Sequence, residues 1–141
     1  MTVIRLFSVI AAALVALALA APGLASSSRT ADAKSWCAWM IHVNTKYSLM
    51  KNRHYLPESE MSVARWKGVI DTTLAQQKHY IAIAPPSLRK TLTHEIAYYA
   101  RVKQKGYILT KAKLGTFTLA ELGQVVDFQR TQCRIRFPPE K

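Results

Sequence analysis

The two cysteines of this 141-residue chain constrain its fold more than any other feature. Cys37 lies between Trp36 and Trp39, and Cys133 lies close to the C-terminus. With two cysteines only one intramolecular pairing exists, and its formation depends on the redox compartment. Neither cysteine has a CxxC partner or a histidine at metal-ligand spacing, so the sequence favours a disulfide over a redox or metal site.

The first residues of the chain predict export. An apolar, uncharged run of about 15 residues follows Arg5 and ends before Pro22, which is the length of a signal-peptide core and short of the ~20 residues of a membrane-spanning helix. Small residues suit cleavage after Ala20, Ala25 or Ala33. An uncleaved membrane anchor is the alternative interpretation of the run. We therefore expect a secreted, extracytoplasmic protein.

Cleavage at the second of these positions divides the chain into three parts. Residues 1–25 are the predicted signal peptide, residues 26–33 a flexible lead-in, and residues 34–141 one helical domain. Export also favours a disulfide between the two cysteines, because oxidising compartments preserve such bonds. In the chain-entropy treatment, closing a loop of this length stabilises the fold by about 4–5 kcal/mol.

Prolines and glycines divide the domain into four predicted helices. The interruptions are "LPES" at 56–59, "APPS" at 84–87 and "LGTFT" at 114–118. Between them apolar residues recur at spacings of three and four, as in a helix with one buried face. The predicted helices cover residues 34–51, 60–81, 86–113 and 118–133. Gly106 lies inside the third helix and predicts a kink there.

The start of the fourth helix has the best local signature in the chain. Thr118 and Glu121 are spaced as a capping box, in which each side chain accepts a hydrogen bond from the other residue's backbone. Phe117 and Leu122 occupy the positions of a hydrophobic staple. Both patterns predict that a helix begins at Thr118.

Four helices with short connections favour an all-α fold, an up-down-up-down four-helix bundle. In that topology the start of the first helix and the end of the last lie at the same end of the bundle. Cys37 and Cys133 occupy these two places, so one disulfide closes the predicted bundle.

The chain is strongly basic. Its formal net charge is +12, and loss of residues 1–25, whose only charge is Arg5, leaves 19 Lys and Arg against 8 Asp and Glu, a net charge of +11. No acid occurs between Glu95 and Glu121, whereas five cations do: Arg101, Lys103, Lys105, Lys111 and Lys113. Such an excess attracts anionic polymers and surfaces, and salt weakens the attraction. We therefore predict that these five cations bind an anionic envelope polymer or a lipid surface.

Other function classes receive less support from the sequence. There is no helix-turn-helix spacing, zinc finger or RNP-like motif, so no specific nucleic-acid partner is expected. The acids are scattered, and no nucleophile with a base, carboxylate pair or metal site stands out. The adjacent His94 and Glu95 are a pair to test, although such a pair is more often a structural hydrogen-bonding group. We therefore predict no catalytic residues and no metal site.

A carrier of haem or another small apolar ligand is the alternative function. Histidine and tyrosine are axial ligands of haem iron, and the interior of a helical bundle is a known cofactor site. The candidate ligands are His54, His79, His94 and Tyr98. The chain has no CxxCH motif for covalent haem attachment and no Glu-x-x-His motif of the di-iron type, so our first expectation is a protein without a cofactor.

The layout of the chain resembles a known group of proteins. The order "WCAW", "APPSLRKTL", a long third helix and a last helix that ends at Cys133 is similar to the small one-disulfide helical secreted proteins common in actinobacteria. The resemblance covers most of residues 34–141. It implies export and a helical fold but no particular activity, since many such proteins have no known activity and some resemble haem carriers. We expect a monomer that binds and does not catalyse.

Overall fold

The computed structural model describes residues 31–139, and this part of the chain is mostly helical. Its α-helices are α2 (Ala31–Lys46), α3 (Val63–Ala75), α4 (Gln77–Ala82), α5 (Arg89–Gln104) and α6 (Leu119–Thr131). Two short strands, β1 (Met50–Lys51) and β2 (His54–Tyr55), form an antiparallel hairpin. Short 3₁₀ turns complete the chain: η1 (Glu58–Glu60), η2 (Pro86–Leu88) and η3 (Leu109–Lys111). The predicted signal peptide, residues 1–25, lies outside the described residues.

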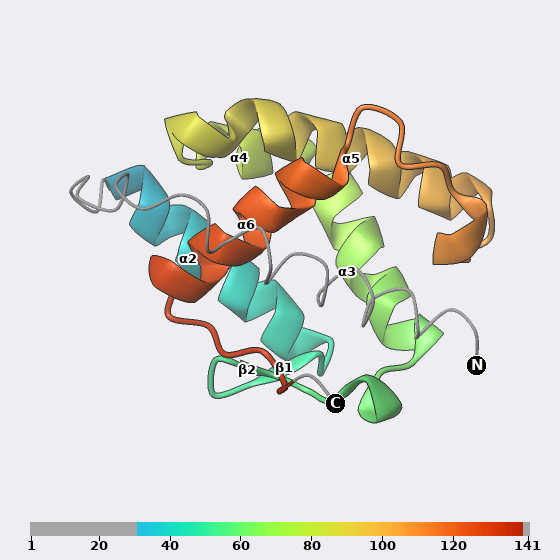
Figure 1. The fold of residues 1–141 in the computed structure, drawn as a ribbon, viewed down its shortest axis with the longest axis horizontal. Helices are drawn as coiled ribbons and strands as arrows, with labels where there is room; N and C mark the ends of the chain where they lie inside the picture. The colour runs from blue at the N-terminus through green and yellow to red at the C-terminus, as the bar shows by residue number, and fades with distance from the viewer. Residues whose placement is uncertain (1–30, 140–141) are drawn as a thin grey trace.

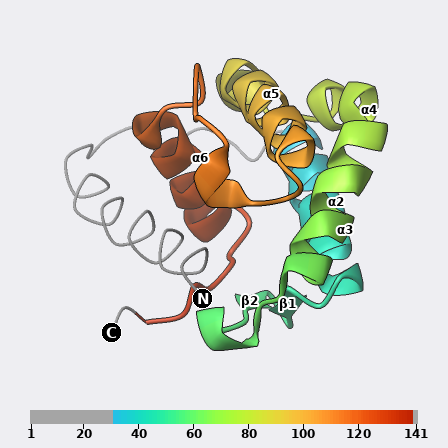
Figure 2. The ribbon, with the colours of Figure 1, turned by 90° about the vertical axis from the view of Figure 1, so that its right-hand side faces the viewer.

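The helices are not arranged as four parallel rods. Figure 1 shows α5 along the top of the molecule, with α3 descending from it at a steep angle. Helix α5 packs against α3, α4 and α6, and α2 packs against α3 and β1. The hairpin lies at the bottom in Figure 1 and in Figure 2, far from α4 and α5. The helical fold with one disulfide is confirmed, but the described residues form five α-helices and a hairpin in place of four helices.

The first helix is shorter than predicted at its C-terminal end. It begins at Ala31, before the predicted start, and ends at Lys46 instead of continuing to residue 51. The chain then turns back through Asn52 and Arg53, which both have positive φ (52° and 62°), as a two-residue type I′ hairpin turn requires. Because the helix ends at Lys46, the side chains of Leu49 and Met50 become buried in the core. The free energy gained by burying these two apolar side chains exceeds that of another helical turn.

The second predicted helix is interrupted at one residue. Gln76 has non-helical dihedral angles (φ −108°, ψ 23°) and separates α3 from α4. Its side-chain oxygen accepts a hydrogen bond from Trp39 Nε1 at 2.9 Å. After the break Tyr80, the one buried residue of α4, packs with its ring centroid 4.8 Å from that of Trp39. Both residues therefore contact Trp39 of α2 at the break between α3 and α4. The spacing of apolar residues in the sequence does not indicate this break.

Gly106 ends the third helix and does not kink it. The Tyr107 N–H donates to the Val102 carbonyl at 2.9 Å, and the Gly106 N–H donates to the Lys103 carbonyl at 3.1 Å. These two bonds form a Schellman motif with Gly106 at the C′ position and a φ of +69°. The predicted helical residues after Gln104 therefore form a loop, which buries Leu109 and contains η3.

The predicted capping box and disulfide are both confirmed. The Glu121 N–H donates to Thr118 Oγ1, and the Thr118 N–H donates to Glu121 Oε2, each at 3.1 Å, so α6 begins where the sequence predicts. Cys37 in α2 and Cys133, just beyond the end of α6, are bonded, and their Cα atoms are 5.2 Å apart. Phe117, at the predicted staple position, is buried beside Tyr98, with ring centroids 5.8 Å apart.

The core consists of three adjoining clusters of buried side chains. The largest surrounds the disulfide and contains Trp36, Met40 and Leu92. A second lies under the loop after α5 and contains Val102 and Phe117. The third joins α2, the hairpin and α3 through Val43, Leu49 and Val69. The disulfide thus lies within the main core and not at its edge.

We expect Gly68→Ala to destabilise the protein by up to about 2 kcal/mol. A Cβ atom at Gly68 would lie 2.2 Å from Cδ1 of Tyr47, whose hydroxyl is hydrogen-bonded to Thr72 at 2.9 Å. Moving that ring costs about 1–3 kcal/mol, which exceeds the gain of about 1 kcal/mol from alanine in a helix. Chemical denaturation measures the change. In a Tyr47→Ala background the same substitution should stabilise α3, and destabilisation there would contradict the explanation.

Candidate functional site

Two of the five predicted anion-binding cations have structural partners. Arg101 donates through Nε to the Lys113 carbonyl at 2.8 Å and through Nη2 to the Leu114 carbonyl, so it holds the loop after α5. Lys103 Nζ lies 3.3 Å from Asp71 Oδ1 in a salt bridge. These two charges are already paired with acceptors within the chain and are less available to an external anion.

Asp71 is the centre of a small polar cluster at this end of α5. The Tyr107 hydroxyl donates to Asp71 Oδ1 at 2.6 Å, and this bond is the largest cause that lowers the pKa of the Asp71 carboxyl, with Lys103 adding to the effect. The same bond raises the pKa of the Tyr107 hydroxyl. An ionised Asp71 therefore offsets part of the positive charge that the sequence pattern assigns to this segment.

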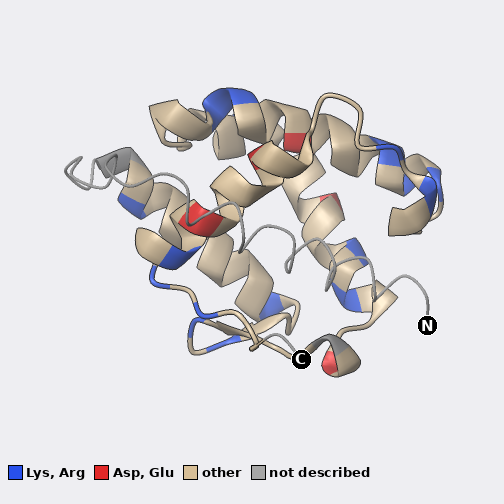
Figure 3. Cartoon of the chain, in the orientation of Figure 1, with Lys and Arg blue, Asp and Glu red and all other residues tan. Residues whose placement is uncertain are grey.

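The other three predicted cations are exposed on the loop after α5. Lys105, Lys111 and Lys113 all lie at the surface. Figure 3 shows basic residues at this end of the molecule and also along the hairpin and the C-terminal segment. The predicted basic segment is therefore not the sole concentration of basic residues among the described residues, and of its five cations only Lys105, Lys111 and Lys113 have side chains without a partner in that part of the chain.

The second basic region joins two segments that are far apart in the sequence. It combines the hairpin with the end of α6 and the segment after it, and we call it the hairpin face. Its cations are Lys51, Arg53, Arg130, Arg134 and Arg136, and all five are exposed. No acid occurs in residues 50–55 or 130–137, which supply this face.

Backbone pairing holds the hairpin face together. The Arg136 N–H donates to the Arg53 carbonyl at 2.8 Å, and the Tyr55 N–H donates to the Arg136 carbonyl at 2.9 Å. His54 and Arg136 thus form a parallel bridge, which adds the C-terminal segment to the hairpin as a third extended segment. Regular backbone bonds therefore place cations from residues 51–53 beside a cation from residue 136.

Side chains anchor the C-terminal part of this face to the core. Cys133 is held by the disulfide, and Ile135 is buried. The ring centroids of Phe137 and Tyr55 are 5.0 Å apart. The Cζ atom of Arg130 lies 5.4 Å from the Phe137 ring centroid. The arginines consequently project from a backbone that is fixed at several points.

The four candidate haem ligands lie on three elements, since His94 and Tyr98 both belong to α5. His54 is exposed in the hairpin and His79 is exposed on α4, and Figure 1 places these two elements at opposite ends of the molecule. Tyr98 is buried in the second core cluster, 5.8 Å from Phe117 between ring centroids. His94 has a carboxylate partner, described next. No hydrogen bond of the described residues joins two of these side chains; His94 and Tyr98, one turn apart on α5, have Glu121 and Phe117 as their partners, and we assign none of the four a ligand role.

His94 pairs with Glu121 and not with its neighbour Glu95. Its Nδ1 lies 2.8 Å from Glu121 Oε1, and the same carboxylate accepts the Thr118 N–H of the capping box. The pair therefore ties the middle of α5 to the first turn of α6. Glu95 points instead into the core, where the Tyr80 hydroxyl donates to it at 2.7 Å.

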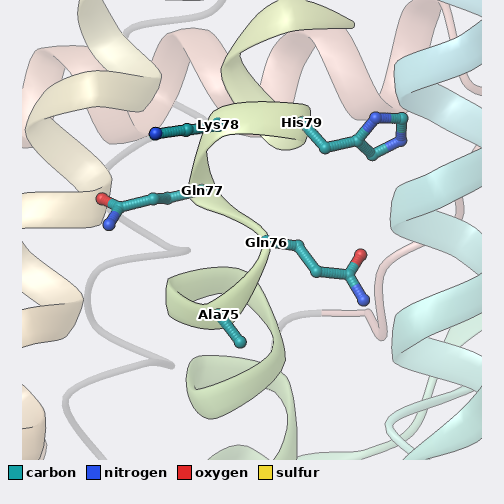
Figure 4. A pocket seen from close by; sticks show the side chains of 5 residues that line it. All are labelled: Ala75, Gln76, Gln77, Lys78 and His79. Atoms are coloured by element: carbon teal, nitrogen blue, oxygen red, sulfur yellow. The ribbon is translucent and has the colours of Figure 1, made fainter.

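A hollow of the surface lies at the break between α3 and α4. It is lined by Ala75, Gln76, Gln77, Lys78 and His79. Figure 4 shows that Gln76 and His79 point to one side of the chain, whereas Gln77 and Lys78 point to the other. The polar groups do not converge on a common point, so the hollow provides no set of groups that would orient a small ligand.

Within residues 31–139 no group of three or more His, Cys, Asp or Glu side chains is placed to hold a metal ion. In the same range no helix is long and apolar enough to span a membrane.

No protein-family model, curated protein or solved structure matches this chain.

The hairpin face is the feature that sequence reasoning missed. Its signals are the short basic stretches "KNRH" at 51–54 and "RIR" at 134–136, which are unremarkable when taken separately. The disulfide and the hairpin bring them together.

Proposed function

We propose that this protein is exported by its N-terminal segment and, as a monomer, binds an anionic polymer or lipid surface of the cell envelope without catalysing a reaction. The observation that carries the proposal is the hairpin face, where five exposed cations lie on one supported backbone and the exposed acid on the same helix end is Asp127, three residues before Arg130. The disulfide is in keeping with an oxidising compartment, where such bonds persist.

The chemistry of the hairpin face suits phosphate and carboxylate groups. Four of its five cations are arginines, whose planar guanidinium groups form paired hydrogen bonds with such anions. Their side chains are exposed, so binding does not require the core to open. The three exposed lysines of the loop after α5 are expected to bind anions more weakly than the hairpin face, because Arg101 and Lys103 beside them have internal partners.

We expect charge reversal of the hairpin face to abolish most of the binding. Each Lys or Arg near an anionic membrane contributes about 1 kcal/mol, so Arg53→Glu/Arg134→Glu/Arg136→Glu should weaken binding by at least about 100-fold. The measurement is sedimentation with vesicles of phosphatidylglycerol and phosphatidylcholine, and separately with isolated cell walls of the producing organism. Binding of the unmodified protein should fall as salt rises, because salt screens exposed charges.

A matched triple variant separates the hairpin face from net charge. Lys105→Glu/Lys111→Glu/Lys113→Glu changes the net charge by the same amount at the other end of the molecule. The proposal expects this variant to lose much less affinity than the hairpin variant. Equal losses would make binding a property of total charge, and no binding to either surface at low salt would remove the proposed function.

A further inference from the structure

Glu95 is a carboxyl group in the middle of the core. It lies in α5, is only 6% exposed, and is surrounded by the main core cluster to which Trp36, Leu92 and Ile96 belong. Both salt bridges found in the described residues, His94–Glu121 and Lys103–Asp71, lie elsewhere. An ionised Glu95 would therefore be a buried charge without a cation beside it, which is a costly arrangement.

The groups that face Glu95 are tyrosines from three elements. Tyr80 of α4 donates its hydroxyl hydrogen bond to Glu95 Oε1 at 2.7 Å. Tyr55 of β2 and Tyr99 of α5 are also close enough for the carboxylate charge to raise the pKa of their hydroxyls, although burial is the larger cause for both. These three hydroxyls are the titratable groups coupled to Glu95 in the described structure, and none of them carries a positive charge.

Burial raises the pKa of the Glu95 carboxyl from its ordinary value of 4.5 to about 7, and the hydrogen bond from Tyr80 partly opposes this rise. The folded protein therefore holds a proton on Glu95 in a pH range where the unfolded chain has released it. The contribution of Glu95 to the free energy of unfolding is therefore largest below pH 4.5, and it is lost as the pH rises from 4.5 through 7. A carboxylate held in a salt bridge has the opposite effect, because its contribution to stability is lost as the pH falls.

Helix α4 is the element that an ionised Glu95 would affect first. It has six residues, and Tyr80 is its one buried residue. It begins at the Gln76 break without a side-chain cap and is followed closely by Pro85 and Pro86. Its attachment to the core therefore depends mainly on Tyr80, whose ring packs against Trp36 and Trp39 and whose hydroxyl reaches Glu95, with a smaller contact from the partly buried Ile81.

We propose that Glu95, together with the hydroxyls of Tyr55, Tyr80 and Tyr99, is a buried proton-binding site that controls the attachment of α4 to the core. With the carboxyl protonated, Tyr80 and the two tryptophans stay packed and α4 is closed. When Glu95 loses its proton, the single hydrogen bond from Tyr80 does not replace the water that an ionised carboxylate requires, and displacement of α4 together with Tyr80 admits that water. The opened state exposes the aromatic side chains of Trp36, Trp39 and Tyr80.

The test compares the unmodified protein with Glu95→Gln at pH 5 and pH 8. From the two pKa values, the unfolding equilibrium constant of the unmodified protein should rise by about 10- to 100-fold between these pH values through Glu95 alone. Glu95→Gln keeps the shape and cannot ionise, so it should lack this rise. Asp127→Asn, which removes an exposed carboxyl of α6, should behave like the unmodified protein.

Two direct measurements apply even if Glu95→Gln fails to fold. A carbon-13 NMR titration of the Glu95 carboxyl should give a midpoint near 7, and a midpoint near 4.5 would overturn the proposal. Hydrogen exchange, corrected for the intrinsic effect of pH, should show about 10-fold or greater loss of protection in α4 at pH 8 relative to α6. Equal protection of α4 at both pH values, or an identical pH response in Glu95→Gln, would also overturn it.

Discussion

Removing the Cys37–Cys133 disulfide will destabilise the protein by about 4–5 kcal/mol. The bond closes a loop of 96 residues between α2 and the segment after α6, and both sulfurs lie in the main core cluster. Opening it enlarges the conformational freedom of the unfolded chain more than that of the folded protein. Cys37→Ala/Cys133→Ala, studied by chemical denaturation beside the unmodified protein, measures the loss.

The same variant also tests how the hairpin face is supported. Cys133 anchors the segment that carries Arg134 and Arg136, so its release should weaken binding to anionic vesicles even at temperatures where the variant is folded. Intact mass before and after reduction is the control, since closing the bond removes two hydrogen atoms. An unchanged mass, or a stability loss below about 1 kcal/mol, would contradict the expected role of the bond.

Trp36→Ala will destabilise the protein by about 3–5 kcal/mol. Trp36 is fully buried beside the disulfide, with ring centroids 5.6 Å from Phe128 and 6.4 Å from Tyr80. Its removal leaves a cavity between α2, α4 and α6, and the extent to which α4 moves into that cavity sets where in this range the loss falls. Circular dichroism during urea denaturation is the suitable measurement, because the substitution changes tryptophan fluorescence directly.

Trp36→Phe is the matched control for that experiment. Trp36 Nε1 is buried and makes no hydrogen bond of ordinary geometry in the described residues, although it lies close enough to the Tyr80 hydroxyl to lower the pKa of that group. A fully unsatisfied donor costs about 1–3 kcal/mol. Phenylalanine removes the donor and keeps most of the ring, so we expect a loss well below that of Trp36→Ala. Comparable losses for the two variants would show that the whole indole is required. Because Trp36 adjoins Cys37, its effect and that of the disulfide should not be additive.

Local sequence signals predicted the features that depend on neighbouring residues. The capping box at Thr118 is confirmed because both of its hydrogen bonds join residues three apart in the chain. Gly106 was correctly identified as a special position, but its role was wrong, because a glycine C′ stop and a kink have the same sequence signature. The Cys37–Cys133 bond followed from there being only two cysteines and from an apolar N-terminus that predicts export.

Features that depend on distant residues were not predicted. The hairpin at residues 50–55 looked like the end of a helix, because Met50 fits the helical apolar period as well as it fits a buried strand position. The break at Gln76 accompanies contacts with Trp39 in another helix. The hairpin face requires residues 51–53 and 130–136 to meet, and no pattern within either segment indicates that they do.

The sequence by itself therefore determined the helical composition, the single disulfide and the positive charge, since each depends on residue type and near-neighbour spacing. The tertiary structure decided which cations share a surface and which have partners. It also placed Glu95 inside the core with Tyr80 as its hydrogen-bond donor, whereas the sequence offered only its neighbour His94 as a partner. The physical reason is that burial and electrostatic pairing are set by groups from other elements. Only the packing of α2, α4, α5 and the hairpin around Glu95 reveals them.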